Sequence, residues 1–199
     1  MVTEPGRGPV PGADGRLRCP WAVSSPEYLG YHDDEWGRPI RDDVGVFERL
    51  CLEGFQSGLS WLTILRKREN FRAAFDGFRI ETVAGYGAAD VARLLADRGI
   101  VRNRAKIEAT IRNARAALEL PAGLAALVWG YAERARDGKA PAQTLDDLAA
   151  ATAESKALAG ELKRAGFAFA GPVTVYSTMQ ACGVVDDHLA GCFRHGAWT

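Results

Sequence analysis

The sequence predicts an all-α fold. Apolar residues recur at helical spacing in one segment after another, and glycine or proline separates most of these segments. The strongest β signal is the run from Val173 to Tyr176. It directly follows Pro172, which suits the first turn of a helix, and its apolar pattern continues with helical period. We therefore expect helices throughout and find no internal repeat that would indicate a solenoid.

Side chains that suit N-caps precede the first two predicted core helices. Asp42 precedes the first apolar face, which Gly54 and Gly58 interrupt. Ser60 precedes the second helix, predicted over 61–75. We expect glycine to end the first helix because it is a poor helix former.

The second half of the chain continues the helical pattern between breaks. Gly99 ends one predicted helix and Asn103 begins the next. Pro121 and Gly123 separate that helix from its successor, and the polar segment 136–144 is a connection. The remaining helices are predicted over 88–97, 103–118, 124–135, 145–150, 153–165 and 172–182.

The composition indicates a single globular domain without a membrane or secretory segment. Of the 199 residues, 47% are hydrophobic and 25% are charged, as in ordinary globular proteins. We expect residues 1–17, rich in proline and glycine, to be a disordered tail, and 18–199 to be one all-helical domain. No apolar run approaches the roughly 18 residues of a membrane span. We expect a cytoplasmic monomer.

One local patch of the chain is strongly basic, although the formal net charge is zero. A glycine turn, Gly99–Val101, joins two predicted helices, and Glu108 is the only acid between 98 and 115. Free amides at a helix start bind anions, and nearby arginines add charge-assisted contacts to phosphate. The alternative is an ordinary solvated face. The basic residues are Arg98, Arg102, Arg104, Lys106, Arg112 and Arg115.

Two cysteine–histidine pairs at opposite ends of the chain form a candidate metal site. Cys19 and His32 lie near the start, and His188 and Cys192, four positions apart, would share one face of a helix. Two thiolates and two imidazoles match the tetrahedral ligand set of zinc, and four protein ligands leave no position for a reactive water. We therefore expect one structural zinc. The alternative is unpaired thiols, which is also our interpretation of the other two cysteines.

Aromatic side chains and one carboxylate form a candidate base pocket. Glu53 lies among apolar neighbours, where its carboxylate would accept hydrogen bonds from an exocyclic amine and favour a cationic base. Flat rings suit an extruded base, which enzymes hold by stacking and by reading its edge. Core packing is the alternative for the rings, and a solvated charge near a helix end is the alternative for Glu53. The aromatic residues are Trp21, Tyr28, Tyr31, Trp36 and Trp61.

Long segments of the chain, taken in order, resemble the bacterial type I 3-methyladenine-DNA glycosylases. They are RCPWAVSSPEYLGYHDDEWG, LCLEGFQSGLSWLTILRKRENFRAAF, GIVRNRAKIEATIRNA and GFAFAGPVTVYSTMQACGVVDDH. The resemblance runs from about residue 18 to 192. The tail before Cys19 is longer than in shorter relatives, and the end after Cys192 is unlike theirs.

This resemblance implies a helix-hairpin-helix glycosylase fold with Gly99–Val101 as the hairpin. The hairpin side of the site would be Gly99, Val101, Arg102, Arg104 and Lys106, which hold the DNA backbone. The structural zinc would be held by Cys19, His32, His188 and Cys192. Glu53 and Tyr31 would contact the excised base, with Trp61 and Tyr28 beside it and Trp21 lining the pocket.

The resemblance also implies a monofunctional enzyme that excises 3-methyladenine from double-stranded DNA. The family lacks the aspartate that related glycosylases place after the hairpin, and this chain has none between Asp97 and Asp137. A base alkylated at nitrogen 3 is cationic and already a good leaving group. Two alternatives remain: a metal-dependent hydrolase built on His32 and its acidic neighbours, and a zinc-stabilised DNA-binding module without chemistry.

Overall fold

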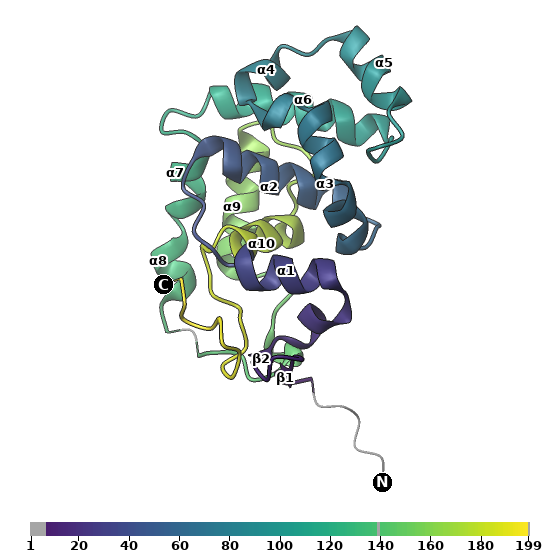
Figure 1. Ribbon diagram of the computed structural model, residues 1–199. Coiled ribbons are helices and arrows are strands. Elements are labelled where there is room, and N and C mark those ends of the chain that lie inside the picture. The colour runs from purple at the N-terminus through teal and green to yellow at the C-terminus, as the bar shows by residue number, and fades with distance from the viewer. Residues whose placement is uncertain (1–6, 139, 199) are drawn as a thin grey trace.

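The computed structural model describes residues 7–138 and 140–198, and helices dominate it (Figure 1). Among these residues, no helix has both the length and the apolar character needed to cross a bilayer. In chain order the elements are β1 (Val10–Pro11), β2 (Leu17–Arg18), η1 (Pro20–Ser24), α1 (Pro26–Asp34), α2 (Asp43–Gln56), α3 (Trp61–Ala74), η2 (Asp76–Phe78), α4 (Ile80–Ala84), α5 (Ala88–Ala96), α6 (Arg104–Leu118), α7 (Leu124–Trp129), α8 (Ala132–Arg136), η3 (Leu145–Asp147), α9 (Ala153–Arg164) and α10 (Pro172–Ala181).

The core is built around α2. This helix packs against α3 and α10, and α10 packs in turn against α9. Every residue of α2 from Val46 to Phe55 is buried except Glu48, so the helix has little solvated face. A carboxylate on such a helix, like that of Glu53, is held inside the protein by its neighbours.

The expected N-caps are confirmed at three helices. The Asp42 carboxylate accepts from an amide of the first turn of α2, and the Ser60 hydroxyl does the same for α3. The Asn103 side chain caps α6. Each cap satisfies one of the backbone donors that a helix start leaves unpaired. The expected helix at 172–182 is also confirmed, as α10, with Pro172 at its first position.

Three expectations for the later helices are wrong. The helix expected over 124–135 is two helices, α7 and α8, which separate at Gly130, a residue of low helix propensity. The helix expected over 145–150 is only the turn η3, which closes because the Asp147 carboxylate accepts from the amides of Gln143 and Thr144. Residues 188–192 lie in turns and not on a helix.

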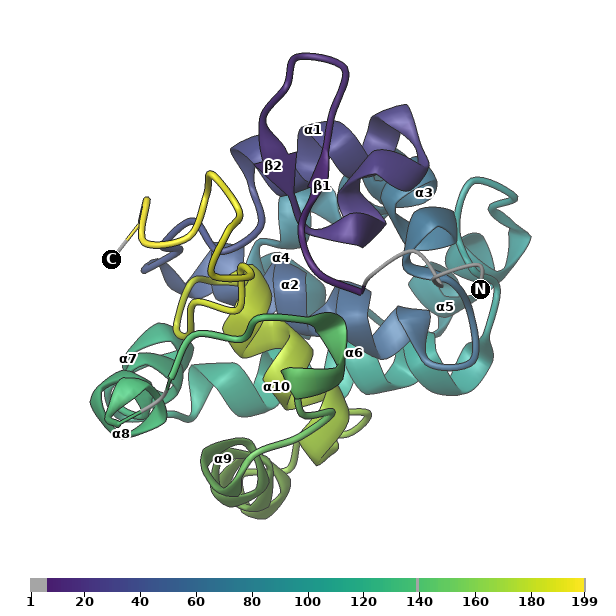
Figure 2. The ribbon, with the colours of Figure 1, turned by 90° about the horizontal axis from the view of Figure 1, so that it is seen from below.

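The tail expected to be disordered is ordered where the structure describes it. Strands β1 and β2 pair antiparallel, with Val10 opposite Arg18. The Arg18 guanidinium is almost fully buried and binds the carboxylates of Asp14 and Asp33, which holds the hairpin against α1. Figure 2 shows this hairpin beside α1. Residues 1–6 of the expected tail lie outside the described residues.

The start and the end of the described chain meet at one end of the molecule. The Phe193 amide donates to the Leu17 carbonyl over 2.9 Å, and the guanidinium groups of Arg16 and Arg18 lie over the Phe193 ring. The C-terminal segment therefore packs directly against the hairpin. This contact brings the two cysteine–histidine pairs into one region.

Candidate active site

The four expected metal ligands meet in one buried cluster. Their ligand atoms all lie within 4.8 Å of one another, and no other such group of three or more His, Cys, Asp or Glu residues occurs in the described chain. Cys192 Sγ lies 3.3 Å from His32 Nε2 and 3.7 Å from His188 Nδ1, and Cys19 Sγ lies 3.9 Å from His188 Nδ1. Zinc–ligand bonds of about 2.0 to 2.3 Å in a tetrahedron require similar separations.

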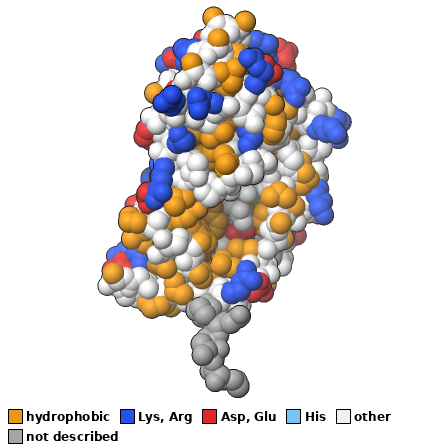
Figure 3. All heavy atoms as spheres, turned by 90° about the vertical axis from the view of Figure 1, so that its right-hand side faces the viewer, with side chains coloured by type: hydrophobic (Ala, Val, Ile, Leu, Met, Phe, Trp, Pro, Cys, Tyr) orange, Lys and Arg blue, Asp and Glu red, His pale blue; other side chains and the backbone are white. Residues whose placement is uncertain are grey.

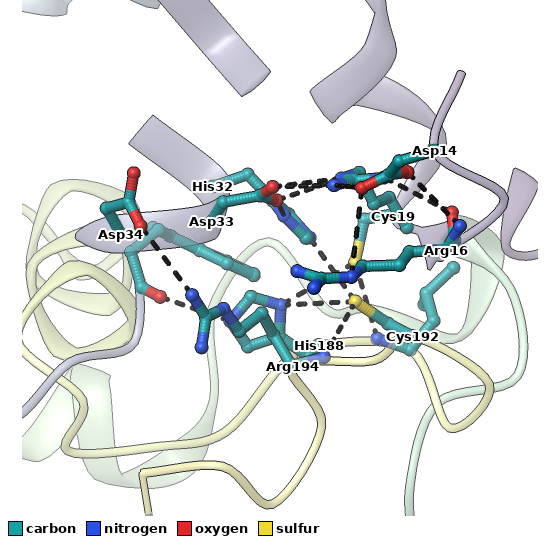
Figure 4. Close-up of polar contacts among 12 residues, drawn as sticks. Asp14, Arg16, Cys19, His32, Asp33, Asp34, His188, Cys192 and Arg194 are labelled. Atoms are coloured by element: carbon teal, nitrogen blue, oxygen red, sulfur yellow. Dashed lines mark hydrogen bonds and ion pairs between the residues drawn. The ribbon is translucent and has the colours of Figure 1, made fainter. Parts of the chain in front are cut away.

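The second nitrogen of each histidine in this metal cluster has its own partner (Figure 4). His32 Nδ1 lies 2.8 Å from an Asp33 carboxylate oxygen, and His188 Nε2 lies 3.1 Å from the Trp36 carbonyl. Such outer partners fix which nitrogen faces the ion and orient the ring. The cluster is therefore arranged for cation binding and could hold a metal ion.

The two thiols of the cluster differ in acidity. Hydrogen bonding to Cys192 and burial raise the pKa of Cys19. The hydrogen bond from Cys19, ahead of those from His188 and His32, holds the pKa of Cys192 well below its usual range. The pair thus carries thiolate charge that a bound cation would neutralise.

A second polar region, the base pocket, lies beside the metal cluster and has a volume of about 240 Å³. All five predicted base-contact residues line it: Trp21, Tyr28, Tyr31, Glu53 and Trp61. The sequence-based selection of contact residues left out four lining residues: Trp36, Gln56, Ser177 and Gln180. Trp36 was among the aromatic candidates. Ser177 and Gln180 are polar residues three apart on α10, which places them on one face of that helix and is the signal that could have found them.

Helices α1, α2, α3 and α10 each contribute to the pocket, with rings held edge to face or tilted. Trp21 meets Trp36 with ring centroids 5.1 Å apart at 86°, and Tyr31 meets Trp61 at 5.4 Å and 49°. The Leu62 amide in the first turn of α3 donates to the Tyr28 hydroxyl over 3.0 Å. Neither of these ring pairs stacks face to face.

Among the described residues, Glu53 is the only carboxylate that lines the pocket. Burial raises its pKa to about 8, and the positive charge of Arg49 opposes this only in part. Among the residues that the structure describes, no hydrogen bond or ion pair reaches the Glu53 carboxyl group. Near neutral pH the carboxyl therefore holds its proton, and a cation placed beside it would favour loss of that proton.

The acidic neighbours of His32 do not form a second metal site. Asp33 binds Arg18, and Glu35 accepts from Arg49 and Arg68. Asp34 is exposed. These carboxylates point to separate arginines, so a divalent-metal hydrolase centre built on this segment is not supported.

The glycine turn joins α5 and α6 as expected, but the basic residues around it differ in role. Arg102 and Arg104 are exposed. Lys106 is 7% exposed, and its ammonium donates to the carbonyls of Phe55 and Ser57 over 2.8 and 2.6 Å. Two of the three ammonium donors of Lys106 are therefore bound to the protein, and its contact with the DNA backbone stays a prediction.

The comparisons with known proteins agree with this geometry. Residues 21–195 match the family model described as methyladenine glycosylase. The chain is 46% identical to DNA-3-methyladenine glycosylase 1 of Escherichia coli (strain K12) over 178 residues, 88% of this chain and 95% of that protein. A crystal structure of 3-methyladenine DNA glycosylase I aligns with a TM-score of 0.83 and 47% identity, over 89% of this chain and 99% of that one.

A further solved structure contains the base itself. A variant of a 3-methyladenine DNA glycosylase I, crystallised in complex with 3-methyladenine, aligns with a TM-score of 0.84 and 35% identity. The alignment covers 89% of this chain and 97% of that one. From the family match, the identities and the shared fold, this chain belongs to the methyladenine glycosylase family.

Proposed function

We propose that this protein is a monofunctional DNA glycosylase that excises 3-methyladenine from alkylated double-stranded DNA during base excision repair. The observation that carries the proposal is the unpartnered, buried carboxyl group of Glu53 in an aromatic pocket. The membership of this chain in the methyladenine glycosylase family and the base bound in a relative support the same reaction. We further propose that the protein acts as a monomer in the cytoplasm, where bacterial DNA is found.

The pocket favours a cationic base over a neutral one. Adenine methylated at nitrogen 3 in DNA carries a positive charge, which would lower the pKa of Glu53 and turn its carboxyl group into a carboxylate. An intact adenine brings no charge, so the same group would stay protonated and the charge attraction would be missing. Burial makes this difference large because charges interact strongly where water is excluded.

The reaction needs little further chemistry from the protein. The damaged nucleotide leaves the base stack, at a cost of a few kcal/mol, and its base enters the pocket between the rings. The bond from the sugar carbon to the base breaks, and its electron pair passes to the base and neutralises the positive charge. Water bonds to the sugar carbon and gives up a proton to solvent. The phosphate backbone stays intact.

DNA would lie on the face that holds the pocket and the glycine turn. The face drawn in Figure 3 is hollowed near its centre, with hydrophobic side chains below the hollow and Lys and Arg side chains gathered above it. We propose that the turn Gly99–Val101 presents its free backbone amides to a phosphate and that Arg102 and Arg104 add charge. Both backbone groups of Gly99 are bound within the protein, so Gly99 contributes through the shape of the turn. Such contacts position the duplex without reading its sequence.

We propose that the metal cluster holds one zinc ion with a structural role. The donor set of two thiols and two imidazoles, together with the outer partner on each histidine, fits zinc. The ion would join the start of the domain to its end through Cys19, His32, His188 and Cys192, and no step of the reaction passes through it.

The test is chromatography of the bases released from methylated duplex DNA. Wild-type protein should release 3-methyladenine and leave the strands uncut. Binding of alkylated DNA without release of any base would instead support the DNA-binding module. Strand cleavage after release would contradict the monofunctional assignment.

A further inference from the structure

Lys67 lies on α3, the helix that begins at the pocket, and its ammonium group binds backbone carbonyls at the glycine turn. Lys67 Nζ, on α3, donates to the backbone oxygens of Arg98 over 3.0 Å and Gly99 over 3.1 Å. The Asn70 side-chain amide, one turn further along α3, also donates to the Gly99 oxygen, over 3.4 Å. The turn is therefore tied to α3, whose first residue, Trp61, lines the pocket.

These contacts determine where the backbone amide of the turn points. A trans peptide unit is planar, and its C=O and N–H groups point in opposite directions. Because the Gly99 oxygen points to α3, the Ile100 N–H of the same unit points away from α3. The preceding amide, that of Gly99, donates to Asp97 Oδ1 over 2.7 Å. Within the described residues the Ile100 amide has no acceptor.

The space at the turn is equally constrained. A Cβ atom at Gly99 would lie 3.0 Å from Asn70 Cβ and 2.9 Å from Asp97 Oδ1. A larger residue at this position would therefore require the Asp97 side chain and Asn70 to shift.

A second lysine, Lys106, connects α2, another helix that lines the pocket, to α6, which follows the turn. Lys106 lies in the first turn of α6, and its ammonium takes the carbonyls of Phe55 and Ser57 at the end of α2. A helix C-terminus carries partial negative charge, so a cation there is stabilised. Helix α2 carries Glu53. The turn is thus connected to two of the helices that line the pocket, α2 and α3.

We propose that Lys67 and Lys106 are positioning residues that hold the glycine turn at a fixed distance from the base pocket, so that one backbone phosphate and the extruded base are bound together. The proposal rests on the proposed function, since it assumes that the turn binds the DNA backbone. It assigns to Lys67 a contact with the protein backbone and not with DNA. Its ammonium group binds two carbonyl groups of the protein.

The test compares Lys67→Met with Arg66→Met in single-turnover release of 3-methyladenine from methylated duplex DNA. Both variants lose one positive charge from the same turn of α3, but Arg66 is exposed and binds Glu27, away from the glycine turn. Lys67→Met should raise the half-saturating enzyme concentration by about tenfold and change the maximal rate by less than about twofold. Arg66→Met should change neither by more than about twofold, and Lys67→Arg, which keeps donors for the carbonyls, should recover most of the loss.

Two further measurements separate this role from others. Binding of free 3-methyladenine should be unchanged in Lys67→Met, which shows that the pocket is intact. The slope of log affinity against log salt concentration should stay within about half a unit of wild type, whereas loss of a direct phosphate contact lowers it by about one. Lys106→Met, if its thermal melt remains cooperative, should show the same split between half-saturation and maximal rate.

Failure of the proposed function and failure of the positioning role give different results. If wild type releases no base, the proposed function fails. If wild type releases base and Lys67→Met matches it, or if the salt slope falls by about one, only the positioning role is overturned.

Discussion

The metal cluster and the base pocket are neighbours that share aromatic walls, but they differ in whether their buried polar groups have partners within the described protein. Trp21 lies 5.1 Å from the His32 ring, and Trp36 lies 4.6 Å from the His188 ring, centroid to centroid, and both tryptophans also line the pocket. In the cluster each ligand atom faces another, and each histidine has an outer partner. In the pocket the Glu53 carboxyl group has no described partner.

The difference supports the proposal that the metal cluster is structural and the base pocket functional. A buried polar group without a partner is costly, so a protein keeps one where a ligand will supply the partner. The buried indole N–H of Trp61, beside the pocket, also lacks a partner in the described chain. The cluster is complete once a cation enters, whereas the pocket is complete only when a polar, positively charged molecule enters. Four predictions test this comparison.

The largest expected effect is on catalysis, at the pocket. Glu53→Gln keeps the size of the side chain and removes its ability to become an anion. Release of 3-methyladenine in single turnover should fall by about a hundredfold or more, while affinity for undamaged duplex DNA stays within about twofold. Release at the wild-type rate would show that the carboxyl group has no part in choosing or expelling the base.

The next effect is on the metal cluster. Cys19→Ser should abolish metal binding at the cluster and lower Tm by about 10 °C or more, because the proposed ion would join both ends of the domain. Cys51→Ala is the matched control: Cys51 is also a buried thiol but lies in the main core, away from the cluster, so metal content should not change. Metal content is measured by elemental analysis. Loss of activity at unchanged Tm would contradict a structural metal.

A smaller effect is expected from the outer partner of a ligand. Asp33→Asn weakens the acceptor that orients His32, so metal affinity should fall by about tenfold in a competition titration with a chelator. Asp34→Asn changes the adjacent, exposed carboxylate and should leave the affinity unchanged. Equal effects of the two substitutions would show that the Asp33 carboxylate does not support metal binding through His32.

The smallest effect is on stability and depends on pH. The pKa of Glu53 is about 8 in the folded protein against 4.5 as its ordinary value, so between these the folded state binds more protons than the unfolded state. The free energy of unfolding therefore falls as pH rises through this window. Glutamine does not titrate, so Glu53→Gln does not lose stability in this way as pH rises. Its Tm should exceed that of wild type by a few degrees near pH 8.5 and by less near pH 5. A difference in Tm that does not change with pH would contradict burial of this carboxyl group.

Helices were predictable from the sequence where an N-cap residue comes directly before an apolar pattern of helical period. Asp42, Ser60 and Asn103 each supply a cap that local geometry alone can satisfy. Helix α1 was missed although it carries the same signals, Ser25 as its cap and Pro26 in its first turn. The break at Gly130 was missed because an isolated glycine within an apolar pattern costs only about 1 kcal/mol and need not end a helix.

The four metal-cluster residues and five of the nine pocket residues were predictable, but the contacts between distant segments were not. Residue type and resemblance selected the four ligands and the five pocket residues that the structure brings together. The ordered β hairpin depends on Arg18 meeting Asp33, and the burial of Lys106 depends on carbonyls near residue 55. Such pairings are set by tertiary packing, which local patterns do not contain.

The most direct measurement is a carbon-13 NMR titration of the Glu53 side-chain carboxyl group in the free protein, assigned by comparison with Glu53→Gln. If Glu53 is buried and has no partner until a charged base arrives, its pKa should lie near 8. A pKa near 4.5, the ordinary value of a glutamate, would show a solvated or already paired carboxylate and would contradict the proposed selection of the cationic base.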